Sequence, residues 1–365
     1  MTIHHAHILA PGQMAGLEKV VLLGLKGLIQ GGQSPECIVI YDSRCPEYGK
    51  IFKEKLDQLG VKSLVVNSKG RFDLATVREL RILLKSRKWS LIHCHGYKAV
   101  LYSFAAFHRY RVPLLATNHG DTSHTFQVKI YEWLQRLVFR FLTKVIVVSS
   151  KQKEHLEKLG LDNSKLILIE NMLPIPPPKN IRVDTDSDKL KLVAIGRLSP
   201  EKGLSDLIDA ISLLNDPNVH LSIVGDGIDR DRLQKQVREL NLTDQIKFEG
   251  FQENIEPFLV DSHGLIAPSH KEAMPLNLIE AACFGKPIIA SNIGINDTLV
   301  HSMRNGLLVP PNSPIKLARA IEVFSKEKEA LTQIAQDMAN QFRSRFSLDF
   351  WVRQTTREYR DAING

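Results

Sequence analysis

Two glutamates, Glu272 and Glu280, have the residue type and spacing most suggestive of chemistry in this sequence. Seven residues separate them, within a segment that runs from Ser269 to Pro287. We expect the first carboxylate in a loop after an apolar strand and the second about two helical turns later, inside the following helix. A sugar joined to a diphosphate needs groups that bind hydroxyls at both ends and positive charge in the middle. Paired acids also occur in glycoside hydrolysis, but here we expect them to position a ligand.

Positive charge for the middle of such a ligand is present in the segment from Gly196 to Gly203, after another predicted strand. Arg197 can hold phosphate oxygens in a bidentate fork, and Lys202 can act as a point charge. Together they could neutralise a leaving diphosphate without a metal. The alternative is a solvated turn with incidental basic residues. A further glycine motif, Gly225-Asp-Gly227, follows the next strand, and we expect it to be structural.

Two segments can present backbone amides to a phosphate. The loop Pro11–Glu18 contains Gly16 where a helix opens, and a helix N-terminus offers unpaired N–H groups. This loop lacks the Gly-x-Gly-x-x-Gly pattern of dinucleotide binding, and its alternative is a plain tight turn. The second segment starts the helix that carries Glu280. Pro275 has no N–H there, so the candidate donors are the three amides that follow it, Leu276, Asn277 and Leu278.

Histidines form a third group. His119 lies in Thr117–Asp121 at a predicted strand end, where it could bind a sugar hydroxyl or support charge near a reacting carbon; the alternative is a satisfied loop histidine. His93 and His95 should share one face of a strand while Cys94 lies on the other, so we expect no metal ligation there. The four cysteines have neither metal-ligand nor disulfide spacing and should be reduced and mostly buried.

Short apolar strands alternate with amphipathic helices throughout, which predicts parallel sheets with crossover helices. The strands include Ile3–Ala10, Leu91–Cys94 and Leu190–Ile195. A proline-rich, then acidic stretch at 174–188 interrupts this pattern and is expected to be a linker. We therefore predict an α/β chain of two doubly wound, Rossmann-like domains, 1–173 and 189–345, facing a central cleft. All the motifs above would lie at carboxyl ends of strands, where such sheets bind ligands.

The 365-residue length agrees with two domains. We expect a cytoplasmic protein, because the sequence has neither a membrane span nor a signal peptide. Residues 1–188 have a net charge of +10 and residues 189–365 a net charge of −2. No nucleic-acid motif accompanies the basic half, so an anionic membrane surface is the better candidate partner. The segment Lys129–Lys144 could be an interfacial helix, and its alternative is a core helix with arginines extended to solvent.

Taken together, these motifs resemble the retaining glycosyltransferases of family four, which have the GT-B fold. The resemblance covers nearly the whole chain. It rests on Gly16-Leu-Glu-Lys19, His119-Gly120, Val148-Ser-Ser150, Asn171, Gly196-Arg-Leu198, Glu201-Lys-Gly203, Gly225-Asp-Gly227, Glu272 to Ala281, Gly285-Lys-Pro287 and Asn305 to Pro310. The sequence departs from the family pattern at Ala15, Met172, Ala273 and the loop Gly294–Thr298. None of these departures removes a charged residue that the chemistry needs.

The resemblance implies a role for each candidate residue. Arg197 and Lys202 would bind the diphosphate and stabilise it as it leaves, with Gly16 and Gly196 close to the phosphates. Glu272 would hold donor sugar hydroxyls, and Glu280 would bind the ribose of the nucleotide. His119 would contact the donor sugar or support the developing charge. The last segment, 346–365, resembles a terminal helix that returns to the first domain.

The resemblance further implies a retaining transferase that moves a hexose from a nucleotide diphosphate sugar, such as a UDP- or GDP-sugar, to a hydroxyl acceptor. No metal or other cofactor is expected, and the acceptor would be a lipid-linked or cell-envelope saccharide reached from the inner face of the cytoplasmic membrane. The alternatives are a sugar-nucleotide epimerase or phosphorylase of the same fold, or a non-catalytic protein that binds sugar nucleotides. Product analysis with a labelled donor separates these activities.

Overall fold

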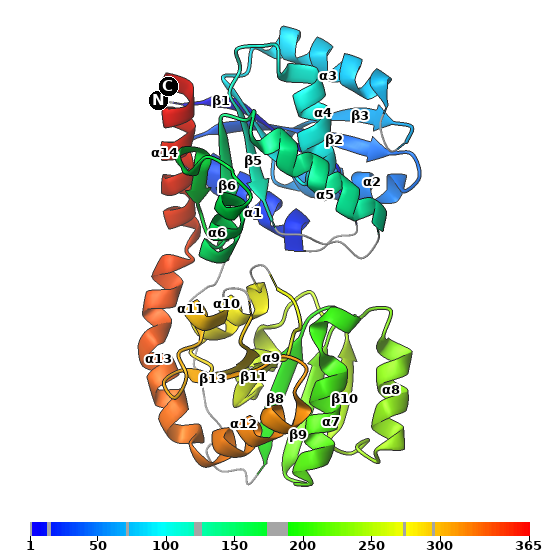
Figure 1. Cartoon of the computed structure of the whole chain (residues 1–365), viewed down its shortest axis with the longest axis vertical. Coiled ribbons are helices and arrows are strands. Elements are labelled where there is room, and N and C mark those ends of the chain that lie inside the picture. Colours follow the sequence, from blue (N-terminus) through cyan, green and yellow to red (C-terminus); the bar gives the residue numbers. More distant parts are fainter. Residues whose placement is uncertain are drawn as a thin grey trace. The chain divides into compact units, whose positions relative to one another are not determined.

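The computed structural model describes residues 2–12, 16–70, 73–119, 126–173, 189–272, 275–293 and 296–365, with only the backbone at 126–129. The chain divides into two compact units. Unit 1 comprises Met1–Pro174 together with Phe346–Gly365, and unit 2 comprises Ile175–Arg345 (Figure 1). The predicted linker, 174–188, lies outside the described residues.

The sheet of unit 1 is parallel, with strand order β3-β2-β1-β4-β5-β6-β7. Its strands are β1 (His4–Leu9), β2 (Ser34–Asp42), β3 (Lys62–Ser68), β4 (Leu91–His95), β5 (Leu114–Asn118), β6 (Lys144–Val147) and β7 (Leu166–Leu168). The order reverses between β1 and β4. Doubly wound sheets bind ligands beyond the strand ends at such a switch point.

Helices cover both faces of this sheet. One face carries α1 (Gly16–Gln30), α2 (Pro46–Gln58) and α14 (Leu348–Asn364); the other carries α3 (Leu74–Arg87), α4 (Tyr97–Phe107), α5 (Phe126–Phe139) and α6 (Ser150–Lys158). Side-chain alternation decides which strand residues meet which layer. Ile8 and Cys94 pack in the core with α3 and α4, whereas His5 and His93 lie against α14. The predicted separation of Cys94 from its flanking histidines is confirmed.

The C-terminal helix α14 packs on unit 1, as predicted. Gly24 and Gly27 of α1 make this possible, because Cβ atoms there would lie 2.8 Å from the Trp351 ring and 2.5 Å from Leu348 Cδ1. Leu173 N also donates to Phe346 O at 3.0 Å. Residues at the far end of the sequence are therefore part of the core of the first unit.

Unit 2 repeats the same architecture with a parallel sheet in the order β10-β9-β8-β11-β12-β13. Its strands are β8 (Leu190–Ile195), β9 (Val219–Val224), β10 (Ile246–Gly250), β11 (Gly264–Ala267), β12 (Ile288–Ser291) and β13 (Gly306–Val309). Its helices are α7 (Leu204–Leu214), α8 (Arg230–Glu239), α9 (Glu256–Asp261), α10 (Leu276–Cys283), α11 (Asn296–Leu299), α12 (Pro314–Lys326) and α13 (Lys328–Arg345). The switch point lies between β8 and β11.

The ends of α10 are set by local chemistry. Pro275 is the N-cap, immediately before the first helical residue, Leu276. At the other end Gly285 has a φ of +66°, and Lys286 N donates to Ala281 O at 2.9 Å. A glycine in the left-handed conformation therefore terminates this helix.

The predicted helix Lys129–Lys144 is wrong at its C-terminal end. Helix α5 ends at Phe139, and Thr143 N already donates to Leu114 O at 2.9 Å, so the chain joins the sheet. Lys144 begins β6, and its Nζ donates to Glu358 Oε2 at 2.6 Å. That ion pair directs the Lys144 side chain to α14, so Lys144 is not part of a surface formed by α5.

Candidate active site

Two strand-end loops of unit 2 pack backbone against backbone. Gly196 follows β8, Gly225 follows β9, and Gly196 N donates to Val224 O at 2.9 Å. A Cβ on Gly225 would lie 1.8 Å from Gly196 O, and the φ of Gly225 is +146°. The Gly225-Asp-Gly227 motif therefore has a structural role: it lets the loop that carries Arg197 lie directly on its neighbour.

Lys202 and Glu272 meet at the switch point of this sheet. The short turn η2 (Pro200–Lys202) lies against the loop after β11, and His270 N donates to Glu201 O at 2.8 Å. Lys202 Nζ donates a hydrogen bond to Glu272 Oε1, which also accepts from Ser269 Oγ at 3.0 Å. The two charged side chains are 22% and 12% exposed. The structure therefore brings together two of the predicted catalytic residues.

Arg197 is the more exposed of the two predicted phosphate-binding cations. Its side chain is 55% exposed, and Nη2 donates to Glu201 Oε1 at 3.3 Å. Ser199 Oγ donates to the same oxygen at 2.7 Å and holds the carboxylate in place. Both cations thus face an acidic partner in this structure. Gly196 lies next to Lys202, because a Cβ on it would be 3.9 Å from Lys202 Cε.

The start of α10 is bound to β8 through Asn277. Its Nδ2 donates to Ile195 O at 2.6 Å, and its Oδ1 accepts from Leu278 N at 2.9 Å. The Leu278 amide, a predicted phosphate donor, is thus bonded to the neighbouring side chain in this structure. The amides of Leu276 and Asn277 remain the predicted donors. Glu280 is partly exposed on the same helix.

Unit 1 holds the other predicted residues. Gly16 is the first residue of α1, so its amide lies at a helix N-terminus. Gly12 N donates to Oε1 of the buried Glu18 at 3.0 Å, which fixes the entry to the loop. Residues 13–15 lie outside the described chain, as do Gly120 and Asp121. His119 follows β5 and is partly exposed.

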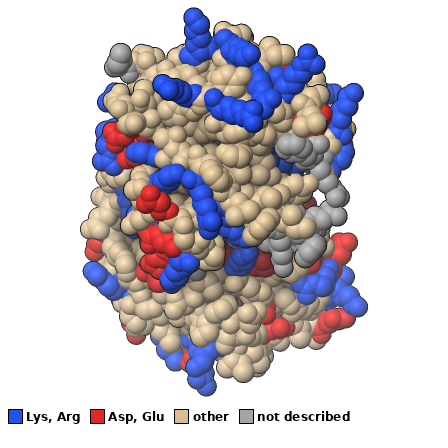
Figure 2. Space-filling view, turned by 45° about the horizontal axis from the view of Figure 1, so that its top comes forward, with Lys and Arg blue, Asp and Glu red and all other residues tan. Residues whose placement is uncertain are grey.

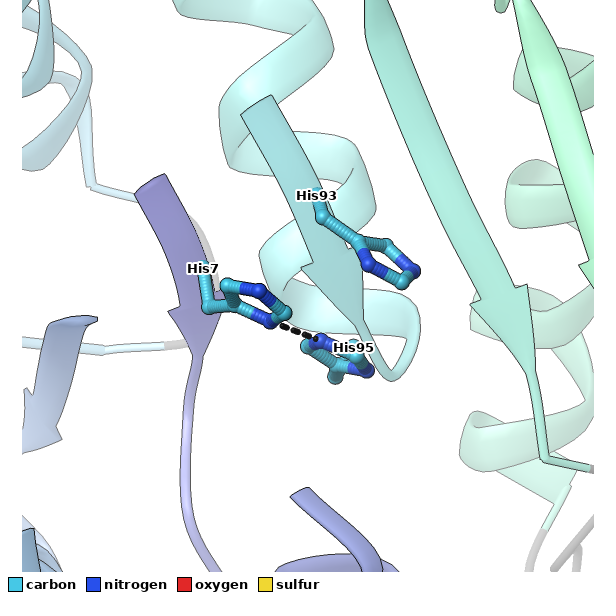
Figure 3. Close-up of side chains that lie close together, drawn as sticks. All are labelled: His7, His93 and His95. Atoms are coloured by element: carbon cyan, nitrogen blue, oxygen red, sulfur yellow. Dashed lines mark hydrogen bonds between the residues drawn. The ribbon is translucent and has the colours of Figure 1, made fainter. Parts of the chain in front are cut away.

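His119 is linked to buried histidines. Its Nε2 lies 3.3 Å from Nδ1 of His95, and Nε2 of His95 lies 2.9 Å from Nδ1 of His7. Figure 3 shows His7 extending from β1 toward His95 on the adjacent strand β4. Desolvation lowers the pKa of His119 to about 4 and holds the pKa values of His7 and His95 well below 6.5. These rings are therefore neutral near pH 7.

His7, His93 and His95 are close enough to be considered as metal ligands. One nitrogen from each lies within 4.8 Å of the others, and all three side chains are buried. Yet all six ring nitrogens already have a hydrogen-bond contact, to another histidine, to Tyr359 or to Thr117. Sequence reasoning missed His7, although the alternation of His5 and His7 in a strand predicted beside Leu91–Cys94 was a usable signal.

Unit 1 also has apolar and basic side chains on its surface. Ile130 and Trp133 of α5 are 44% and 54% exposed, and Phe141 just after it is 71% exposed. Other α5 residues, including Val138 and Phe139, are in the core, so α5 both packs in the core and exposes apolar side chains. Lys and Arg outnumber Asp and Glu on the upper part of Figure 2, which is unit 1. Each described helix is too short or too polar to span a bilayer.

Comparison with known protein families gives two matches that meet near the boundary between the units. Residues 14–175 match the model described as Glycosyltransferase Family 4, and residues 179–341 match the model described as Glycosyl transferases group 1. Between them the two models account for most of unit 1 and most of unit 2.

Comparison with curated proteins finds bacterial glycosyltransferases. The chain is 28% identical over 155 residues to the lipopolysaccharide core biosynthesis glycosyltransferase LpsE of Rhizobium meliloti, covering 42% of this chain and 45% of LpsE. The chain thus matches about half the length of that protein. It is 27% identical over 276 residues to the UDP-Gal:alpha-D-GlcNAc-diphosphoundecaprenol alpha-1,3-galactosyltransferase of Escherichia coli, covering 70% of this chain and 71% of the relative.

Among solved structures, HepE of Anabaena in complex with UDP superimposes with a TM-score of 0.82 and 21% identity. The match covers 98% of this chain and 100% of HepE. The likeness confirms the predicted fold class, GT-B with two doubly wound Rossmann-like units.

Proposed function

This chain belongs to the group 1 glycosyl transferases, and we propose that it moves a hexose from a nucleotide diphosphate sugar to a hydroxyl acceptor with retention of configuration. The observation that carries this proposal is the group of Gly196, Arg197, Lys202 and Glu272 at the switch point of unit 2. It combines cations for a diphosphate with a carboxylate for sugar hydroxyls. Strand ends at a switch point are where such sheets bind nucleotides.

The donor we propose first is a UDP-sugar. The E. coli relative is named for UDP-galactose, and HepE was crystallised with UDP. Glu280, one helix turn beyond the α10 N-terminus, would bind the ribose hydroxyls. Thermal shifts with uridine, guanosine and adenosine diphosphate sugars test the base, and a larger shift with a guanosine donor would replace this choice.

In the proposed mechanism the leaving diphosphate is stabilised by fixed cations rather than by a metal. Arg197 and Lys202 would neutralise charge as the bond between the anomeric carbon and the phosphate oxygen breaks. The departing phosphate oxygen would then take the acceptor proton on the same face of the sugar. One well-placed donor of this kind contributes about 3–4 kcal/mol to the barrier reduction. We expect transfer to persist in EDTA. If EDTA abolished transfer and Mg²⁺ restored it, the metal-independent mechanism would be contradicted.

Arg197→Ala tests the assignment directly. We expect transfer from a labelled donor to fall at least about a hundredfold, because one charge on the developing diphosphate is lost. Arg232→Ala is the matched control, since Arg232 is 54% exposed and also pairs with a carboxylate, but lies on α8. Unchanged turnover in Arg197→Ala would contradict the assignment. Epimerised or phosphorolysed sugar without transfer would instead support one of the related activities.

We further propose that unit 1 contacts an anionic membrane from the cytoplasmic side, where a lipid-linked or envelope saccharide is the acceptor. Ile130, Trp133 and Phe141 are exposed, and so is Arg140, which precedes Phe141 in the sequence; exposed apolar and basic side chains of this kind suit an interfacial surface. Trp133→Ala with Phe141→Ala should reduce sedimentation with anionic liposomes several-fold. Ile228→Ala, an exposed apolar residue of unit 2, should not. Equal sedimentation with neutral and anionic lipid would count against the proposal.

A further inference from the structure

We propose that Tyr359, on the C-terminal helix α14, is a positioning residue that decides which ring nitrogen of His119 carries the proton. It would act through a continuous series of hydrogen bonds along buried histidines. The inference rests on the proposed role of His119 in binding the donor sugar. All of its members belong to unit 1.

The first half of the series runs from His119 to Tyr359. His119 Nε2 lies 3.3 Å from His95 Nδ1, and His95 Nε2 lies 2.9 Å from His7 Nδ1. His7 Nε2 lies 3.3 Å from the Tyr359 hydroxyl. The rings of His7 and His95 therefore each have one nitrogen in the contact on the His119 side and the other in the contact on the Tyr359 side.

The second half returns from Tyr359 to β5. The Tyr359 hydroxyl lies 2.7 Å from His93 Nδ1, and His93 Nε2 lies 2.7 Å from Thr117 Oγ1. His7 and His93 are opposite each other in the pairing of β1 with β4, yet their hydrogen-bond connection runs through Tyr359. Since Thr117 and His119 are two residues apart, the series begins on β5 and ends at the residue that follows it.

A neutral imidazole has one N–H donor and one acceptor nitrogen, so each ring passes the direction of hydrogen bonding to the next. The Tyr359 hydroxyl can accept from both of its neighbours, but only two directions also place its own proton in a contact of the series. If Thr117 donates to His93, each following group donates in turn, and His119 receives at Nε2 with its own proton on Nδ1. In the reverse direction His119 donates from Nε2, and Nδ1 is an acceptor.

The first direction is the one we infer. In the first direction the Thr117 hydroxyl proton is donated to His93 Nε2, a contact that the structure contains. In the reverse direction Thr117 accepts from His93, so its own proton requires another acceptor. His119 Nδ1 would then donate to an oxygen of the donor sugar. Burial keeps the three inner histidines neutral and raises the pKa of Tyr359 well above 10, so every group retains the form that the series needs.

Tyr359 is the member whose loss interrupts the series with the smallest change of shape. Its hydroxyl both accepts and donates, whereas phenylalanine does neither. A cavity of about 10 Å³ lined by His7, His95 and His119 lies beside the series, near the lower limit for one water. Removing the Tyr359 hydroxyl leaves His7 and His119 without a direct hydrogen-bonded link to His93 and Thr117.

The experiment compares Tyr359→Phe with Thr355→Val on the same helix. Thr355 is fully buried, and its hydroxyl has no hydrogen-bond partner, so the valine removes a hydroxyl outside the series. Long-range ¹H–¹⁵N spectra of histidine-labelled protein, with His119 assigned by His119→Gln, report the tautomer directly. We expect the Nδ1–H form in the wild type and in Thr355→Val, and a mixture in Tyr359→Phe. Transfer measured as kcat/KM should fall about tenfold in Tyr359→Phe only.

An unchanged His119 tautomer in Tyr359→Phe would overturn the inference. So would a divalent metal bound stoichiometrically to His7, His93 and His95 in the resting protein, because ligation would displace the hydrogen bonds. The spectra need no substrate. If no donor supports transfer, the proposed function fails while the tautomer result still decides whether Tyr359 controls His119.

Discussion

Lys202 and Glu272, 70 positions apart in the sequence, form a hydrogen-bonded ion pair at the switch point of the second sheet. Lys202 ends the turn after β8, and Glu272 lies in the loop after β11. Gly203 makes the approach possible: its φ is +64°, and a Cβ there would lie 2.1 Å from Pro268 O. The pair means that the residue proposed for the sugar also orients the residue proposed for the diphosphate.

Glu272→Gln should therefore impair both roles. The side chain keeps its shape but loses its charge, so Lys202 loses its ionic partner and the sugar hydroxyls lose a charged acceptor. Hydrogen bonds to charged groups contribute about 1.5–3 kcal/mol, so we expect kcat/KM for transfer to fall about 10- to 100-fold. Glu249→Gln is the matched control, because Glu249 is 15% exposed and pairs with Lys247 on β10. Wild-type kinetics in Glu272→Gln would remove this residue from the site.

Glu280→Ala should weaken nucleotide binding through the ribose. Calorimetry with UDP and with its 2′,3′-dideoxy analogue isolates that contact. The wild type should prefer UDP by about tenfold or more, and the variant should bind the two nucleotides alike. Glu239→Ala on α8 provides an exposed control. Retained discrimination in Glu280→Ala would assign the ribose to another residue.

Gly203→Ala should lower stability and transfer more than the left-handed backbone angle of Gly203 alone predicts. Gly250→Ala is the control, because Gly250 has a similar φ of +72° but no atom within 4 Å of its would-be Cβ. Both variants pay about 1–2 kcal/mol for a left-handed alanine. Only Gly203→Ala must also displace Pro268 and with it the loop that holds Glu272. We expect a larger fall in melting temperature and a loss of transfer, and equal effects of the two variants would contradict this account.

As the pH falls, unit 1 should begin to lose stability at a higher pH than it would if only carboxylates took up protons. The pKa values of His5 and His119 are lowered to about 4, and burial lowers those of His7, His93 and His95 well below 6.5. The unfolded chain binds protons below about pH 6.5 that the folded chain does not. This stability is therefore fully present above pH 6.5 and declines as the pH falls, by up to about 1.4 kcal/mol per pH unit for each histidine.

Tryptophan fluorescence measures this effect selectively, because Trp89, Trp133 and Trp351 all belong to unit 1. The urea midpoint of that signal should fall steadily between pH 7 and pH 5. His5→Leu should make the dependence shallower, and His108→Gln, which removes an exposed histidine, is the control. A midpoint independent of pH over this range would show that the cluster is not buried as neutral imidazoles.

Much of the fold was predictable from local pattern. Strand β8 has the predicted bounds, and β1 and β4 differ from theirs by no more than one residue at either end, because apolar periodicity and flanking glycines or prolines act within a few residues. The termination of α10 at Gly285 was predictable for the same reason. The end of α5 was not: the apolar run continues past Phe139, and only pairing with β5 turns the chain into a strand.

The candidate site was likewise predictable only in part. Sequence alone placed Arg197, Lys202, Glu272 and His119 after strands, because the residue types and their distance from an apolar run are local properties. It could not show that Lys202 and Glu272 pair, that Asn277 occupies the Leu278 amide, or that Tyr359 joins His7 to His93. Those contacts depend on strand order and on α14 returning across the first sheet. Chain separations of 70 and 352 residues become hydrogen bonds only after the sheets are assembled.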